Sequence, residues 1–298
     1  MGSRVRRDSF SRPENDTRIK STWERFLNGE NRPSDALRCL VDDSWRRCLS
    51  GQVDPLQDQA APPLDNDHIA HLRKRHEGLI SVSAPLMAQA RDFLAQTGTV
   101  MILTDPEGTI LDVEGDPRMR HPLEDVRLIP GCNWTESVIG TNAIGTAIAT
   151  GQPVQIHAAE HFCAGVQQWT CSATIIRDPL DSSILGAIDV SGLSRSYSRH
   201  SLALAITTAG RIESKLSRLE MEHRFKLLER CVDRLAGGGA DGILIFDRRG
   251  HLVKANEKAA QALAALGIHF ELTGSAHIAG LQGGYGVAPG GAGLPDWR

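Results

Sequence analysis

The chain has 298 residues, of which 41% are hydrophobic and 23% charged, and its formal net charge at pH 7 is -3. These are the proportions of a folded globular protein, and the length favours two domains. The balance of charge excludes a global positive field for nucleic acid. No apolar run approaches the roughly 20 residues of a membrane span, and no signal segment follows the N-terminus, so we expect a cytoplasmic protein without membrane contacts.

The cysteines are few and widely spaced. Disulfide frameworks are typical of much smaller secreted domains, so we expect reduced thiols here. The six positions are Cys39, Cys48, Cys132, Cys163, Cys171 and Cys231.

The N-terminal part divides into an arm and a helical region. Residues 1–33 are polar with few apolar anchors, which predicts a flexible arm with little order. Residues 34–97 form the N-terminal helices. Apolar residues at helical spacing predict a first helix over 37–49, with Ser34 and Asp35 placed to cap it.

A second helical stretch and an α+β core follow. Apolar periodicity predicts helix from Asp65 to Leu94, with Pro85 as a break or kink. Residues 98–197 then alternate between strand-like runs and turns, which predicts a mainly antiparallel sheet flanked by helices. The expected strands are 99–104, 109–113, 153–156, 172–177 and 184–190, and the expected helix is 134–150.

One long helix is predicted over residues 198–236, because no proline interrupts this segment. A helix of this length spans ~55 Å, which favours a linker that also joins two copies over a helix packed only on its own sheet. The step from Leu219 to Phe225 is six residues, so the seam changes register between its two runs. The seam positions are Ile212, Leu216 and Leu219, then Phe225, Leu228, Val232 and Leu235.

A smaller unit is expected at 240–298, after the glycines at 237–239. Its start predicts a strand over 242–246, a second strand over 251–254, and a helix that begins at Asn256. The following segment is rich in glycine and has little apolar periodicity. About 60 residues are near the lower limit for independent folding, so we expect an incomplete domain.

One region concentrates the residue types of a recognition site. Trp134 and Trp169 can wall an apolar pocket, while nearby polar groups orient a small ligand. The alternative is that both indoles are core residues and Asn142 is a helix cap. The candidate ligand-binding residues are Trp134, Glu136, Thr141, Asn142, His161, Cys163, Trp169, Cys171 and Ser172.

Metal and thiol chemistry are the competing interpretations of the same region. His157-Ala-Ala-Glu160-His161 matches the H-x-x-E-H zinc-peptidase signature, but it follows a strand-like run, so we interpret it as a chance match. His161, Cys163 and Cys171 could instead form a metal-dependent or redox sensor or enzyme, although their spacing fits no standard zinc pattern. We expect no bound metal.

The sequence contains no nucleophile elbow and no P-loop. We therefore expect no catalytic residues and no cofactor.

Several ordered motifs resemble one family. They are Ser44-Trp45-Arg46-Arg47-Cys48 with Asp54-Pro55, the segments 134–145 and 160–172, Arg177-Asp-Pro, and Leu185-Gly-Ala-Ile-Asp-Val-Ser-Gly. Over about residues 35–235 the chain resembles the N-terminal GAF sensor of sigma-54-dependent transcriptional activators, of the acetoin catabolism regulator type. Residues 241–266 look like the start of the PAS domain that follows in such proteins.

The resemblance implies a non-enzymatic module that senses a small organic effector. Such regulators continue with an AAA+ ATPase and a helix-turn-helix, which this sequence does not contain. We therefore expect DNA and RNA polymerase to be contacted only through domains absent from this chain. A homodimer formed through the helix at 198–236 is the expected assembly, and the chain is either a fragment or a natural short form.

Overall fold

The computed structural model describes residues 9–30, 35–236, 242–247 and 250–266. The chain divides into two compact units, Met1–Ser217 and Arg218–Arg298. In the described part, no helix combines the length and apolar character needed to cross a bilayer. The predicted glycine break at 237–239 and the predicted glycine-rich end of the chain lie outside the described residues.

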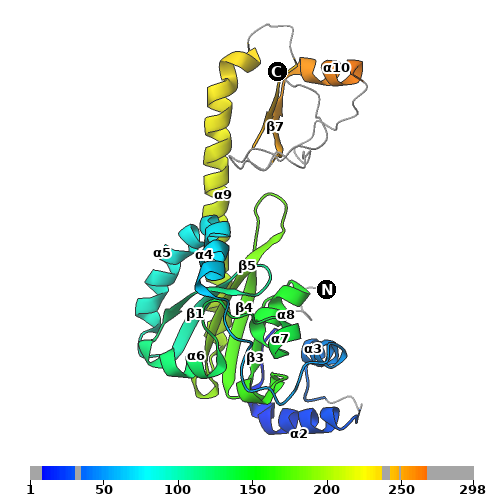
Figure 1. Cartoon of the computed structure of the whole chain (residues 1–298), viewed down its shortest axis with the longest axis vertical. Coiled ribbons are helices and arrows are strands. Elements are labelled where there is room, and N and C mark those ends of the chain that lie inside the picture. The colour runs from blue at the N-terminus through cyan, green and yellow to red at the C-terminus, as the bar shows by residue number, and fades with distance from the viewer. Residues whose placement is uncertain (1–8, 31–34, 237–241, 248–249, 267–298) are drawn as a thin grey trace. The chain divides into compact units, whose positions relative to one another are not determined.

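A five-stranded antiparallel sheet is the centre of the first unit (Figure 1). The order is β2-β1-β5-β4-β3, so β5 lies in the middle and forms ladders with β1 and β4. The α+β class with a mainly antiparallel sheet is confirmed. The strands are β1 (Thr99–Thr104), β2 (Ile110–Gly115), β3 (Val154–His157), β4 (Trp169–Arg177) and β5 (Ile184–Leu193).

Helices cover both faces of this sheet. On one face, α8 (Ala143–Thr150) packs against β4 and β5, and its side chains share an apolar cluster with Val100 and Ile102 of β1. The neighbouring residues of β1 point to the other face, because side chains alternate along a strand. There α5 (Glu77–Leu94) packs on β1 and β2.

The long helix α9 (Arg199–Ala236) begins beside α5, where the Arg211 guanidinium donates to Gln89 Oε1 at 3.3 Å. Its first turns bury Leu202, Ala205 and Ile212. One continuous helix over this region was predicted, and the structure confirms it.

The N-terminal segment is more ordered than its composition indicated. Helix α2 (Asp16–Leu27), preceded by the short η1 (Pro13–Asn15), buries Ile19 and Trp23. The Trp23 Nε1 donates to the carbonyl of Phe162 at 2.8 Å. The expectation of a flexible arm is therefore wrong for 13–27, because this polar helix has an amphipathic face that packs on the core.

The first predicted helices need two corrections. Helix α3 (Cys39–Ser50) begins later than expected, with Arg38 at the N-cap and no side-chain cap bond. Asp35 is therefore not its cap, and Ser34 lies outside the described residues. The second stretch consists of α4 (Asn66–Arg75) and α5, and Pro85 lies inside α5 without breaking it.

The single helix expected over 134–150 is instead two, α7 (Glu136–Ile139) and α8. Gly140 separates them with a φ of +68°, and a Cβ there would lie 2.8 Å from the Cβ of Phe162. The Asn142 side chain then caps α8 by accepting from the Gly145 N–H at 2.9 Å. The remaining short helices of the unit are η2 (Pro117–Met119), α6 (Arg120–Val126), η3 (Ala158–Glu160), η4 (Ala164–Val166) and η5 (Ser194–Ser196).

The second unit includes the end of α9 and an antiparallel pair, β6 (Leu244–Phe246) and β7 (Leu252–Ala255). The Asn256 side chain accepts from the Ala259 N–H at 3.0 Å and starts α10 (Glu257–Ala265). These elements match the predicted strand, turn, strand and helix. The predicted domain boundaries remain predictions.

Candidate functional site

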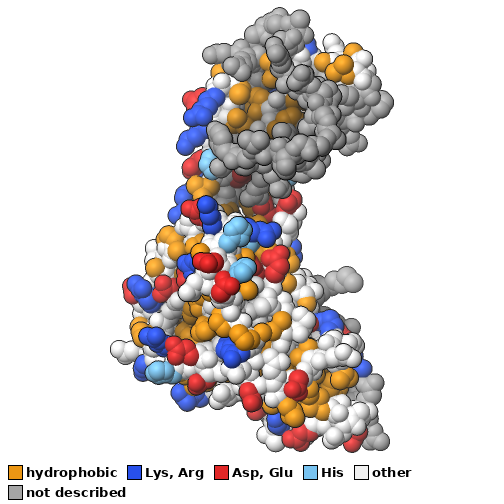
Figure 2. Space-filling view, viewed as in Figure 1, with side chains coloured by type: hydrophobic (Ala, Val, Ile, Leu, Met, Phe, Trp, Pro, Cys, Tyr) orange, Lys and Arg blue, Asp and Glu red, His pale blue; other side chains and the backbone are white. Residues whose placement is uncertain are grey.

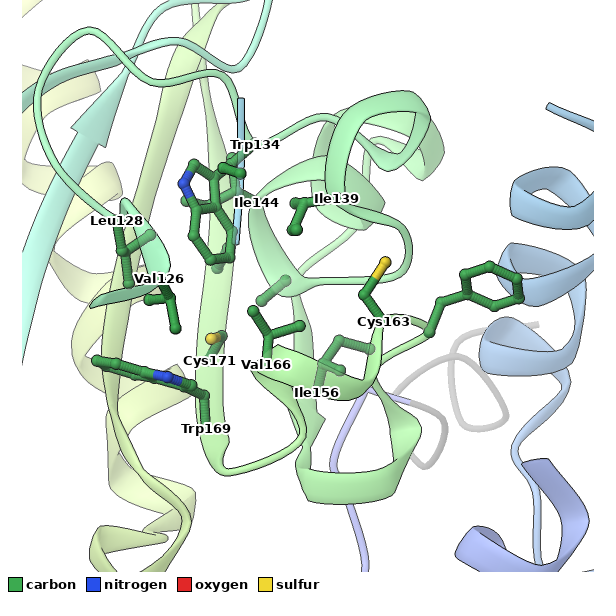
Figure 3. Close-up of a cluster of buried hydrophobic side chains, with 14 of the residues drawn as sticks. Val126, Leu128, Trp134, Ile139, Ile144, Ile156, Cys163, Val166, Trp169 and Cys171 are labelled. Atoms are coloured by element: carbon green, nitrogen blue, oxygen red, sulfur yellow. The ribbon is translucent and has the colours of Figure 1, made fainter. Parts of the chain in front are cut away.

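Two tryptophans and a cysteine meet in the core of the first unit. Trp134 precedes α7, and Trp169 and Cys171 lie on β4, which begins three residues earlier than expected. Each indole is 1% exposed, and both belong to one apolar cluster with Cys171 and Cys163 (Figure 3). The binding role predicted for the two indoles stays a prediction.

A polar pair borders this cluster on the central strand. The register pairs Ser191 of β5 with Cys171 of β4 and with Val100 of β1, and pairs Asp189 with Ala173 and Ile102. Asp189 and Ser191 therefore lie on the apolar face of the sheet.

The Asp189 carboxyl is completely buried. Its Oδ1 accepts the Ser172 N–H at 3.0 Å, and its Oδ2 is hydrogen-bonded to the Ser191 hydroxyl. Burial raises the pKa of Asp189 to about 7, because no cation compensates the loss of hydration, although the two hydrogen bonds oppose the shift. Near neutral pH this buried carboxyl is therefore partly protonated.

The indole nitrogens differ in their partners. Trp134 Nε1 donates to the Arg127 carbonyl at 3.0 Å. Trp169 Nε1 is buried and has no hydrogen-bond partner among the described residues. An unpaired buried donor is unusual in a folded protein and costs about 1–3 kcal/mol. A ligand acceptor placed beside this nitrogen would remove that cost.

A surface pocket of about 310 Å³ lies next to the cluster. It is bordered by β1, β2 and α6, and its charged lining includes Arg91, Glu114 and Arg120. Its apolar lining includes Val100, Leu123 and Leu128, which also belong to the buried cluster. The pocket thus shares part of its apolar wall with the cluster, while Trp134, Trp169 and Asp189 are not among its lining residues.

Glu136 and Thr141 belong to a different group. The Glu136 carboxylate accepts two bonds from the Arg47 guanidinium, at 2.7 and 2.8 Å, and further bonds from Ser44 and Thr146. Thr141 is hydrogen-bonded to Ser44 at 2.6 Å. These bonds join α3 to α7 and α8, so the two side chains fasten helices rather than line the indole cluster.

Three more candidates have structural partners. Asn142 is the cap of α8, which was the alternative weighed for it. Ser172 points to the opposite face from Cys171, and its hydroxyl accepts from Gln155 Nε2 at 3.0 Å. His161 is fully buried, and its Nδ1 lies 3.0 Å from the Ala158 carbonyl. Burial lowers the pKa of His161 to about 4.

The H-x-x-E-H match has no helical context. Glu160 lies in η3, and its carboxylate forms a buried ion pair with Arg38, whose Nη2 is 2.8 Å from Oε2. The Glu160 carbonyl also accepts from Trp45 Nε1 at 2.8 Å. Glu160 thus joins the N-terminal helices to the sheet, and it is not placed as a general base.

The thiols do not have the features of a reactive site. Burial raises the pKa of Cys163 to about 12 and that of Cys171 well above the ordinary value. The six cysteines are all free thiols. Among the described residues, His161, Cys163 and Cys171 do not form a group of closely facing metal-ligand atoms.

Sequence reasoning missed Asp189 and Ser191. The available signal was a carboxylate within the apolar run Ile188-Asp189-Val190, where strand alternation places it on one face. In the sequence, this run belongs to the family motif Leu185-Gly-Ala-Ile-Asp-Val-Ser-Gly.

Figure 2 shows charged and hydrophobic side chains interspersed over the visible face of the first unit.

A family model described as "MimR, N-terminal domain" matches residues 15–214. Among solved structures, the E. coli DhaR(N)-DhaL complex contains a chain similar in fold, with a TM-score of 0.63, 22% identity, and coverage of 80% of this chain and 79% of that one.

Curated relatives include transcriptional activators. The Bacillus subtilis acetoin dehydrogenase operon activator AcoR is 27% identical over 79% of this chain and 38% of its own length. The propane 2-monooxygenase operon activator MimR of Mycolicibacterium goodii is 30% identical over 69% and 34%, respectively. A Rhodococcus erythropolis protein named only as uncharacterized is 31% identical over 88% and 61%. The chain thus spans between about a third and two thirds of these relatives. It belongs to the MimR N-terminal domain family and corresponds to the N-terminal sensory region of sigma-54-type transcriptional activators, as the resemblance predicted.

Proposed function

We propose that this chain is a non-enzymatic regulatory module that binds a small organic effector beside Trp134, Trp169 and Cys171. The observation that carries the proposal is the polar pair Asp189 and Ser191 at the border of an otherwise apolar cluster. Binding sites for small molecules combine apolar walls with a few placed polar groups, and this arrangement has both.

The chemistry of the site favours a small ligand with hydroxyl or carbonyl groups. Trp169 Nε1 offers a donor without a partner. Asp189, with its raised pKa, can donate a hydrogen bond to a carbonyl when protonated or accept one from a hydroxyl when ionised. Alcohols, ketones and diols of a few carbon atoms fit these conditions.

A thermal-shift screen tests this proposal. The full chain is heated with a panel of small alcohols, ketones, diols and aromatics, since a compound that binds only the folded state raises the unfolding midpoint. Trp169→Phe keeps an aromatic ring and removes the N–H, and Asp189→Asn removes the carboxyl. Both should reduce the shift, whereas Thr207→Ala, on the exposed face of α9, should keep it.

The outcome for each variant needs two measurements, ligand affinity and free energy of unfolding. Unchanged affinity in Trp169→Phe and Asp189→Asn would show that these residues serve packing alone. A panel without any stabilising compound would also contradict the proposed class of effector.

We also propose a homodimer formed through α9. Met221, Phe225, Leu228 and Val232 follow one another at steps of four, three and four, which is the spacing of a coiled-coil seam. Three of these side chains are largely exposed, Met221 at 62%, Phe225 at 68% and Val232 at 53%. A second copy that presents the same residues would cover them.

Sedimentation tests the dimer. Leu228→Asp places an unpaired charge in the seam and should shift the protein toward monomer, while Lys226→Asp places the same charge beside the seam and should not. Wild-type protein that sediments as a monomer at tens of micromolar would overturn the proposal.

The finer domain assignment rests on the family resemblance. We propose that 98–197 is the core of a GAF sensor, that 198–236 is its linker helix, and that 240–298 is the start of a PAS-like domain. The chain is proposed to act in the cytoplasm, and its relatives are longer than the matched segment. Contacts with DNA and RNA polymerase are therefore assigned to domains outside this chain.

A further inference from the structure

A junction between two helices faces the turn of the first hairpin. His76 is the single residue between α4 and α5. Asp105 and Glu107 lie in the turn that joins β1 to β2. One ligand atom from each of these three side chains lies within 4.8 Å of the other two. The group is separate from the indole cluster and from every candidate residue described above.

The turn holds Asp105 in a fixed position. Its Oδ1 accepts the Thr109 N–H at 2.7 Å, and its backbone N–H and carbonyl bond to Thr109 and Gly108. The side chain is buried, whereas Glu107 is exposed. The group therefore combines one rigid carboxylate with one that can change rotamer.

The imidazole has an unused nitrogen. His76 Nε2 is buried and has no hydrogen-bond partner in the part of the chain that the structure describes. Within the described residues, no hydrogen bond or ion pair joins His76 to Asp105 or Glu107, although their ligand atoms are close. Three polar groups thus converge without satisfying one another, which is the arrangement that a bridging cation would complete.

We propose that His76, Asp105 and Glu107 form a binding site for a divalent transition-metal ion. One imidazole nitrogen with two carboxylate oxygens suits Mn²⁺, Fe²⁺ or Zn²⁺ rather than soft, thiolate-preferring ions. Metal–ligand bonds of about 2.0–2.2 Å place neighbouring ligand atoms about 3.0–3.5 Å apart. A rotamer change of the exposed Glu107 supplies part of the closure that this requires.

The bound ion would connect elements that are distant in sequence. It would join the α4–α5 junction to the β1–β2 turn, and so fasten the helices to the edge of the sheet. With three protein ligands, the remaining coordination positions are left to water. The proposed role is therefore stabilisation of this corner of the domain, independent of the effector site.

Titration with Mn²⁺, followed by loss of the signal of the aqueous ion in electron paramagnetic resonance, tests the site. Mn²⁺ is chosen because it has little affinity for the free cysteines. The full chain should bind one Mn²⁺, and added Zn²⁺ should displace it. His76→Gln and Glu107→Gln should each weaken binding about tenfold or more. His68→Gln is the matched control, because His68 faces the single carboxylate of Asp65 on the exposed side of α4.

The fold is not at risk in the Glu107 variant, because that side chain is exposed. Circular dichroism of each variant confirms that it is folded. Wild-type protein that binds no Mn²⁺ at about 1 mM would overturn the proposal, since affinities weaker than that are not specific. Equal binding in His76→Gln, Glu107→Gln and wild type would overturn it as well.

Discussion

The buried carboxyl of Asp189 should make the stability of this protein depend on pH. Its pKa is about 7 in the folded state and about 3.9 in an unfolded chain. Between these values the folded state holds one proton more than the unfolded state, so the free energy of unfolding decreases as pH rises. From about pH 5 to about pH 8 the loss amounts to about 3 kcal/mol.

The substitution Asp189→Asn isolates this effect. Asparagine is neutral throughout, and its Oδ1 can accept the Ser172 N–H while its Nδ2 donates to Ser191 Oγ, which preserves both contacts of Asp189. The free energy of unfolding of the variant minus that of the wild type should therefore increase by about 3 kcal/mol between about pH 5 and about pH 8. Contributions shared by both proteins cancel in this difference.

Urea denaturation, followed by tryptophan fluorescence at both pH values, measures the difference. Pairs of curves with equal slopes show that the comparison concerns stability alone. A difference between variant and wild type that stays constant from the lower to the higher pH would refute the reasoning. In that case the Asp189 carboxyl would be ionised in the folded state, and solvent or a cation would have to reach it.

The remaining predictions concern other buried groups and one turn. Burial lowers the pKa of His161 to about 4, so the free energy of unfolding should fall as pH decreases from about 6.5 to about 4. His161→Gln should remove this pH dependence. A variant with the same pH dependence as the wild type in urea denaturation would contradict the prediction. Arg38→Ala leaves Glu160 buried without its ion-pair partner and should lower the free energy of unfolding by about 3–5 kcal/mol in the same assay. A loss as small as that of an exposed ion pair would show that water replaces the arginine. Gly140→Ala forces a left-handed residue against Phe162 and should lower stability by about 1–3 kcal/mol, whereas an unchanged denaturation midpoint would show that the turn relaxes at no cost.

Local patterns were sufficient to predict most elements. The five strands of the central sheet and the long helix α9 all occur where hydrophobic periodicity placed them, within a few residues. Periodicity succeeds there because alternation and helical spacing are properties of neighbouring residues. It failed for α2, whose apolar residues are too few to stand out before their packing partners are known. It also failed at Gly140, because a glycine within a helical pattern indicates a break only when the neighbouring packing is known.

Only part of the candidate site could be predicted from the sequence. Composition alone drew attention to Trp134, Trp169 and Cys171, and these residues do share one cluster. Glu136 was drawn in by proximity in sequence, yet its partner Arg47 lies 89 residues away. Asp189 was overlooked, because one carboxylate in an apolar strand gives no local indication of what lies across the sheet.

The sequence by itself determined the succession of strands and helices along the chain, the family motifs and the long helix. Tertiary structure alone decided which side chains share a face and which polar groups find partners. The register of β5 against β1 and β4 places Asp189 beside Ile102 and Ala173 rather than in water. The packing of α4 and α5 on β1 and β2 brings His76 to Asp105. The physical reason is that secondary structure depends on interactions between near neighbours, whereas burial, pKa and ligand geometry depend on groups that only the folded chain brings together.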